Sequence, residues 1–252
     1  MERKQSEINI LVIGDGCVNE FIYCDIERIC PEAPVPVLTP THKTENPGMA
    51  ANVFANVKRL GGNVDLITNQ ELIKKTRYVD NRSGQMVIRV DHNDKCKRIG
   101  FSQQLPQYDA VIISDYCKGF LTEEDINYIS NQFPLTFLDT KKQLGDWCKN
   151  IDFIKINEFE HKKNFERIPN YPNLEDKLII TRGSKGCEYK SKLYSVPEVS
   201  VKDVSGAGDT FLASLVIAYI KSQDIETAIK YANENATIVV QKFGTYTLTK
   251  ED

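Results

Sequence analysis

The segment DVSGAGDTF, residues 203–211, contains the side chains of this sequence that are best suited to chemistry. It places glycines, a carboxylate and a hydroxyl directly before a long apolar run, residues 211–220, which predicts the start of a buried helix. The first N–H groups of a helix lack partners inside the helix, and the helix dipole favours negative charge at this end. Gly206, Ala207 and Gly208 would therefore hold an anion. Asp209, which we expect to stay ionised, could take the proton from a substrate hydroxyl while these N–H groups stabilise a transferring phosphoryl group.

The same pattern also fits an ordinary loop entering a buried helix, with Ser205 or Asp209 as a capping residue. Short glycine patterns are weak evidence by themselves. On this segment alone, both interpretations stay open.

Two further segments combine small or polar residues near a predicted strand end or helix start. In PGMAANVFANV, residues 47–57, Gly48 and Asn52 stand at the entry of a helix, where a polyol could approach closely; tight helix packing through alanines explains the segment equally well. Asn157 and Glu160 follow a strand, and their amide and carboxylate groups suit Mg²⁺ held through water. Each signal is weak when taken alone.

Two other strand ends carry cations. ITRGSKG, residues 180–186, ends a strand in a turn that could face a nucleotide phosphate, although a surface turn with Arg182 in solvent fits it too. SDYCKGFL, residues 114–121, places Asp115 and Lys118 beyond another strand end.

Composition narrows the classes of protein. The chain has 252 residues, a formal charge of −3, 41% hydrophobic and 27% charged residues, which predicts one globular domain and gives no broad attraction to nucleic acid or anionic membranes. No apolar run approaches the ~18 residues that span a bilayer, and the first residues lack the apolar region of a signal peptide. Seven cysteines without a Cys-x-x-Cys pair indicate reduced thiols rather than metal ligands. We therefore expect a cytoplasmic protein that acts on small molecules.

The elements that must position these residues alternate along the chain. Short apolar runs predict buried parallel strands at 8–13, 64–68, 110–114, 135–139, 153–156 and 177–181, and helical patterns between many of them include 50–60, 122–132 and 210–220. This order predicts a mainly parallel sheet with helices on both faces. Ligands bind outside the carboxyl ends of such strands, which places Asp15 at the functional rim. The first strand lacks the G-x-G-x-x-G turn, which disfavours a Rossmann dehydrogenase.

Two segments interrupt the alternation. Residues 21–39 and the following position carry prolines at 31, 34, 36 and 40, which exclude a helix and suit short edge strands. Residues 77–90 alternate like a hairpin around 81–84. Together they predict a small accessory sheet within the single domain.

Taken together and in this order, the segments resemble the ribokinase-like (PfkB) family of sugar kinases. The resemblance implies a three-layer α/β/α fold with a mainly parallel central sheet and a small β lid, and a phosphoryl transfer that uses ATP and Mg²⁺. Within the family, the chain is most similar to kinases that phosphorylate D-glycero-D-manno-heptose 7-phosphate at O1, on the route to ADP-heptose for lipopolysaccharide. The segments that carry this likeness are ERICPEAPVPVL, SDYCKGFL, LDTKK, INEFE, DVSGAGDTF and ANENATIVVQKFGT.

The resemblance also implies a role for each site residue. Asp209 would be the catalytic base, and Gly206, Ala207 and Gly208 would form the anion hole. The sugar would be held by Asp15, Asn19, Gly48 and Asn52, with Lys118, Asp139 and Lys141 at the phosphate end. Glu160, with Asn157, would organise Mg²⁺ through water. ATP would lie along Asn157, Thr181, Arg182 and Gly183, with Asn233 and Gly244 at the adenine. The lid strands would join two copies as a homodimer.

Three departures from the family pattern leave the acceptor open. Met49 stands where the family usually has a second glycine, and Asn19 stands where the heptose kinases usually have an aspartate. The stretch 66–76 is shorter than usual by about a helix and a strand, which should expose an apolar face or an unpaired edge that something else covers. A kinase of another sugar or sugar phosphate, or a nucleotide-binding scaffold that lost catalysis, are the alternatives.

Overall fold

The central layer is a mainly parallel sheet. The computed structural model describes residues 8–100 and 105–249, and within these ranges the larger sheet has eight strands in the order β12-β11-β10-β9-β8-β7-β1-β4. The parallel strands are β1 (Asn9–Gly14), β4 (Asn63–Thr68), β7 (Ala110–Asp115), β8 (Thr136–Thr140), β9 (Phe153–Asn157) and β10 (Leu178–Thr181). Two short antiparallel strands, β11 (Cys187–Tyr189) and β12 (Lys192–Tyr194), extend one edge. Every strand predicted for this sheet from its apolar run is confirmed.

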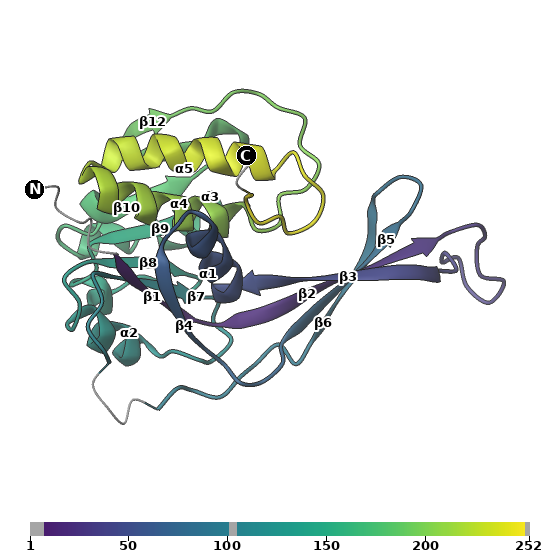
Figure 1. Ribbon diagram of the computed structural model, residues 1–252, viewed down its shortest axis with the longest axis horizontal. Coiled ribbons are helices and arrows are strands. Elements are labelled where there is room, and N and C mark those ends of the chain that lie inside the picture. Colours follow the sequence, from purple (N-terminus) through teal and green to yellow (C-terminus); the bar gives the residue numbers. More distant parts are fainter. Residues whose placement is uncertain (1–7, 101–104, 250–252) are drawn as a thin grey trace, which may run out of the picture.

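Helices cover both faces of this sheet (Figure 1). Alternate residues of β1 face opposite sides: Ile10 and Val12 pack with one core cluster, and Leu11 and Ile13 pack with the other. The first cluster lies under α1 (Ala50–Arg59), α4 (Ala207–Ser222) and α5 (Ile225–Val239). The second lies under α2 (Glu123–Ser130), η1 (Asp146–Cys148) and η2 (Ile168–Asn170). The remaining short helices are α3 (Glu158–Asn164), η3 (Glu175–Lys177) and η4 (Gly183–Lys185).

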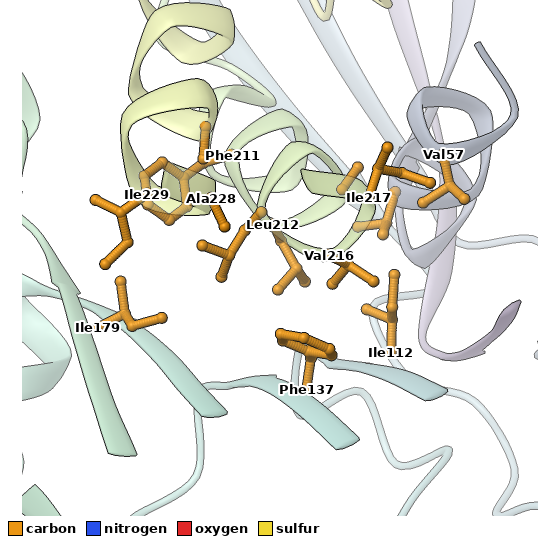
Figure 2. Close-up of a cluster of buried hydrophobic side chains, with 14 of the residues drawn as sticks. Val57, Ile112, Phe137, Ile179, Phe211, Leu212, Val216, Ile217, Ala228 and Ile229 are labelled. Atoms are coloured by element: carbon orange, nitrogen blue, oxygen red, sulfur yellow. The ribbon is translucent and has the colours of Figure 1, made fainter. Parts of the chain in front are cut away.

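The helix that follows the glycine segment is fixed by this core. Leu212 and Val216 of α4 lie above Ile112, Phe137 and the other strand residues of the first cluster, as Figure 2 shows. Because these side chains are buried, the start of α4 is held against the carboxyl ends of the strands. Within the part of the chain that the structure describes, no helix is long and apolar enough to cross a membrane.

A second sheet forms an arm that projects from this body (Figure 1). Its strands, in the order β3-β2-β5-β6, are β3 (Thr39–Met49), β2 (Gly16–Asp25), β5 (Lys74–Asp80) and β6 (Met86–His92), and we call this sheet the lid. The predicted hairpin across residues 77–90 is present as the antiparallel pair β5 and β6.

The first predicted lid segment differs from the expectation. Strands were expected within residues 21–39, but β2 ends at Asp25, β3 begins at Thr39, and the stretch between them holds only the isolated bridge between Ile29 and Pro36. Prolines at 31, 34 and 36 lack the N–H that a strand ladder needs. The proline-rich stretch therefore joins two lid strands instead of forming them.

The shortened stretch lies between β4 and β5. Five residues, 69–73, join the edge strand of the central sheet directly to the lid. Asn69 fixes this connection, because its side chain accepts the Gly16 N–H at 2.7 Å and donates to the Gly16 carbonyl at 3.2 Å. Among the described residues, β4 pairs only with β1, so it is the unpaired edge that the shortening predicts. Tyr108, whose hydroxyl donates to Asp65 of β4 at 2.9 Å, covers part of it.

Candidate active site

The start of α4 is built around a glycine that no other residue could replace without a shift. Gly206 precedes the helix with φ of 83° in the left-handed region. A Cβ there would lie 2.8 Å from the amide nitrogen of Asn52 and 2.8 Å from a methyl group of Thr245. Asp209 follows in the first turn and is only 3% exposed. The glycine segment thus brings α1 and the C-terminal region to the predicted base.

Asp209 is held from two sides by neutral donors. The Asn52 amide donates to Oδ2 at 2.9 Å, and the Tyr116 hydroxyl donates to Oδ1 at 2.6 Å. Asn56 in turn donates to the Asn52 side-chain oxygen at 3.2 Å, which fixes the direction of that amide. Asn52, predicted to hold the sugar, is wholly buried, and its amide orients the Asp209 carboxyl.

Burial shifts the pKa of this carboxyl in the direction opposite to that favoured by the helix start. The helix start was expected to keep Asp209 ionised, but loss of solvent raises its pKa above the ordinary aspartate value, although the hydrogen bonds from Tyr116 and Asn52 oppose this. A buried carboxylate with a raised pKa is a stronger base than an exposed one. The site therefore favours proton abstraction.

Lys155 is a site residue that the sequence reasoning missed. It lies on β9, is 4% exposed, and its Nζ is 2.8 Å from Asp139 Oδ2. A Cβ on Gly208 would lie 2.8 Å from the same Nζ, so this ammonium group sits directly beside the start of α4. A lysine inside the otherwise apolar run FIKIN was the signal that could have revealed it. A buried cation here would add to the anion-holding N–H groups of the helix.

The predicted acceptor residues come together where β1 passes into the lid. Asp15 is wholly buried, and its carboxylate accepts backbone N–H groups from the loop after β7, including that of Tyr116 at 2.6 Å. Burial and the neighbouring Asp115 raise its pKa. Asn19 of β2 lies diagonally across from Gly48 of β3, and a Cβ on Gly48 would lie 2.4 Å from the Asn19 amide nitrogen. Any larger residue at 48 would have to displace the Asn19 amide group or the neighbouring Cys17 thiol.

The lysines predicted for the phosphate end already have carboxylate partners. Lys118 forms an ion pair with Asp94. Lys141 forms an ion pair with Glu160, and its Nζ lies 3.5 Å from Asp139. These pairs reduce the positive charge that either lysine offers to a substrate.

Arg77 of β5 has a different environment. It is 9% exposed, donates to the Asn19 side-chain oxygen at 2.9 Å, and lies over the Phe21 ring at 5.2 Å. Among residues 8–100 and 105–249, no ion pair with a carboxylate neutralises its guanidinium group. It lines a cavity of about 800 Å³ between the lid and the loop before α4, which also includes Ser205 and Gly244.

A second cavity, of about 310 Å³, lies on the other side of the α4 start. Three of the residues predicted to bind ATP line it, and so do two of the anion-hole residues: Thr181, Gly183, Asn233, Ala207 and Gly208. Apolar residues of the connection after β12, Val196, Val199 and Val201, form much of the remaining wall. A mainly apolar cavity with a few polar groups suits a flat heterocyclic base.

Other predicted nucleotide residues lie outside this cavity. Arg182 pairs with Glu158 at 3.2 Å and with Glu188 at 2.9 Å, and Gly244 lines the lid cavity. Asn157 lies beside Thr181 in the register of β9 and β10.

Asn157 and Glu160 form a reciprocal cap at the start of α3. The Asn157 side chain accepts the Glu160 N–H at 2.8 Å, and Glu160 accepts the Asn157 N–H at 2.8 Å. Their amide and carboxylate oxygens are donors of the type that hold Mg²⁺ through water, so the donor set fits that ion. In the described ranges, no group of three or more His, Cys, Asp or Glu side chains is placed to hold a metal.

The chain is similar to known proteins over most of its length. Two curated relatives are the bifunctional protein HldE of a Nitratiruptor species, 28% identical over 96% of this chain and 63% of its own length, and that of Koribacter versatilis, 29% identical over 94% and 60%. The chain thus spans about three fifths of the length of these relatives.

Solved structures share the fold. The nucleoside kinase of Methanocaldococcus jannaschii, an archaeal member of the ribokinase family, superposes with a TM-score of 0.69 at 20% identity, covering 96% of this chain and 94% of its own. Phosphofructokinase-2 of Escherichia coli gives 0.71 at 15% identity, covering 97% and 96%. The chain has the predicted ribokinase-like α/β fold. The sequence pattern of the pfkB family carbohydrate kinases matches residues 101–252, and the chain therefore belongs to this family of phosphotransferases, which act on a sugar hydroxyl.

Proposed function

We propose that this chain is an ATP-dependent kinase of a sugar phosphate, and that its acceptor is D-glycero-D-manno-heptose 7-phosphate, phosphorylated at O1 for ADP-heptose and lipopolysaccharide synthesis. The observation that carries the kinase chemistry is the position of Asp209. It lies in the same helical turn as Ala207 and Gly208, which line the proposed nucleotide cavity, while Asn52 and Tyr116 hold it on the acceptor side.

The proposed reaction uses this arrangement directly. Asp209 takes the proton of the acceptor hydroxyl, whose oxygen forms a bond to the γ-phosphorus as the bond to the β-phosphate oxygen breaks and ADP leaves. The N–H groups at the start of α4 and the Lys155 ammonium group stabilise the charge on the transferring group. Asp209 then releases its proton to solvent.

Mg²⁺, when bound, would neutralise phosphate charge. Asn157 and Glu160 would hold it through water at the carboxyl end of β9. We expect turnover to stop in excess EDTA and to return with Mg²⁺. Replacing Glu160 with Gln should raise the metal concentration required more than it changes the KM for the sugar.

Two observations support a phosphorylated acceptor. The signature segments of the chain resemble the heptose 7-phosphate kinases, and the lid cavity contains the buried guanidinium group of Arg77. Burial and the nearby Arg89 lower the pKa of Arg77, so an anion beside it would be favoured. The resemblance implies Lys118 and Lys141 at the phosphate end, but both lysines have carboxylate partners, and Arg28 is exposed in the proline-rich loop. We therefore assign the acceptor phosphate to Arg77.

We also propose that the protein acts in the cytoplasm, as a homodimer joined through its lid strands. All seven cysteines are free thiols, which suits a reducing compartment. The exposed apolar residues Met86, Val87 and Ile88 lie on β6, at one edge of the lid sheet.

ADP release from ATP, measured against a panel of sugars and sugar phosphates, tests the proposal. Heptose 7-phosphate should give the highest kcat/KM, and Asp209→Asn should lower kcat by at least ~10²-fold with little change in ATP affinity or thermal stability. Arg77→Gln should raise KM for phosphorylated acceptors more than for unphosphorylated ones. Faster turnover of plain hexoses than of any sugar phosphate would reject the acceptor, and an active Asp209→Asn variant would reject the mechanism.

A further inference from the structure

Tyr116 touches both buried aspartates of the site. It follows β7 directly, and its backbone N–H donates to Asp15 at 2.6 Å while its hydroxyl donates to Asp209 at 2.6 Å. The Lys141 ammonium group lies over its ring, 5.1 Å from the ring centre. The side chain is thus fixed at its backbone, at its face and at its hydroxyl.

The hydroxyl can only act as a donor to Asp209. Burial and the negative charges of Asp209 and Asp139 raise the pKa of Tyr116 well above the ordinary tyrosine value, so the phenol keeps its proton. Asn52 supplies the matching donor at the other carboxylate oxygen. Each oxygen therefore keeps one lone pair for the acceptor hydroxyl.

Other groups around Asp209 act through charge. Asp139 on β8 disfavours its ionised form, and Lys155 on β9 favours it. Lys141 after β8 and Cys17 on β2 also interact with it electrostatically. A neutral donor differs from these, because it stabilises the carboxylate without adding a charge that would compete for the phosphoryl group.

We propose that Tyr116 is a positioning residue that keeps the Asp209 carboxylate ionised and aimed at the acceptor hydroxyl. It also links this catalytic base to Asp15, which lies where the lid joins the body. This role rests on the proposed kinase function. Burial raises the pKa of Asp209, and the hydrogen bond from the tyrosine hydroxyl opposes this rise. Tyr116 therefore sets the lowest pH at which the enzyme works.

Tyr116→Phe isolates the hydroxyl, because the ring beneath Lys141 and the N–H bond to Asp15 remain. Losing a hydrogen bond to a charged group should raise the pKa of Asp209. The acid limb of the kcat/KM profile, which falls as Asp209 gains a proton, should therefore move to higher pH by about one pH unit. Activity should drop several-fold at low pH and approach the wild-type value at high pH, with KM for ATP unchanged.

Tyr108→Phe is the matched control. Its hydroxyl also donates to a carboxylate, Asp65 at 2.9 Å, but on the edge strand β4. This variant should keep the wild-type profile. If Tyr116→Phe proves unstable, 3-fluorotyrosine at position 116 keeps the whole side chain and is a stronger donor, so it should move the acid limb the opposite way, to lower pH.

An equal loss of activity at every pH, or an unchanged profile, would overturn the role of Tyr116. These results differ from failure of the proposed function, which would appear in the wild-type protein as absent sugar-dependent ADP release, or in Asp209→Asn as retained turnover. The two ideas can therefore fail separately.

Discussion

Lys155 places a buried positive charge beside the helix start that would receive the phosphoryl group. Its Nζ is 2.8 Å from Asp139, and both side chains are almost fully buried. Removing one partner of a buried ion pair commonly destabilises a protein, so Lys155 could be present for stability alone. The contact with Gly208 adds a second reason, because a cation beneath an anion-binding helix start stabilises developing negative charge.

Lys155→Met should lower kcat by about 10²-fold, the size of effect seen when one preorganised electrostatic donor is removed from an active site. KM for the acceptor should change little, since Lys155 contacts Gly208, which lines the proposed nucleotide cavity. Steady-state kinetics and a thermal denaturation curve would measure both effects.

Lys142→Met provides the comparison. Lys142 also pairs with a buried aspartate, Asp115 at 2.6 Å, but the structure places it away from Gly208. The Lys142→Met variant should be less stable than the wild type, and its kcat should stay within a few-fold of the wild-type value. Equal kcat losses in the two variants would show that Lys155 has only a structural role.

At the scale of elements, the joint between β3 and α1 is strained. Met49 is 4% exposed and has φ of 58° and ψ of −135°, a conformation that residues other than glycine rarely adopt. Such a backbone costs about 1–3 kcal/mol. Its side chain packs with Cys17 and Ile73, so burial offsets the strain. Methionine in place of the usual glycine thus fills an apolar space, and the backbone at this residue is strained as a result.

This balance predicts an unusual order of stability. Met49→Ala removes the buried side chain but keeps the backbone strain, while Met49→Gly removes both. The free energy of unfolding should therefore be about 1 kcal/mol higher for the glycine variant than for the alanine variant. Ala55→Gly, within α1, should show the ordinary order and cost about 1 kcal/mol. Denaturant unfolding measures all three, and an alanine variant as stable as the glycine variant would mean that residue 49 is not strained.

At the scale of the whole molecule, the lid leaves apolar side chains in solvent. Met86, Val87 and Ile88 are 56%, 40% and 50% exposed on β6, and exposed apolar edge strands invite pairing with another chain. If the lid joins two copies, Val87→Asp should shift the protein from dimer to monomer and weaken sugar binding. Sedimentation velocity at micromolar concentration, with sugar titration, checks this.

Leu193→Asp is the control for that experiment. Leu193 is 52% exposed on β12, the far edge of the central sheet, and the same change there should leave association unaffected. A wild-type protein that sediments only as an active monomer would remove the dimer from the proposal without touching the kinase chemistry.

The strands of the central sheet could be predicted because each is a short apolar run between polar residues, a local signal. The contacts that make the site could not. Asn52 and Asp209 are 157 positions apart, and Arg77 and Asn19 are 58 apart. Whether Lys118 would be free or paired with Asp94 depended on side chains that only the folded lid brings together. Residue types predicted the chemistry, and the fold decided which of them remain available for it.

At two of the connections between the lid and the body, no loop separates the elements that are joined. Asp15 alone separates β1 from β2, and β3 ends at Met49 where α1 begins at Ala50. Because these joints have no intervening loop, a tilt of the lid would also move the Asp15 carboxylate and the start of α1. The Asn52 amide, which lies in the first turn of α1 and donates to Asp209, would move with it. A sugar bound in the cavity between the lid and the loop before α4 would be linked to Asp209 through these two joints, so that transfer proceeds when an acceptor is bound and little ATP is lost to water.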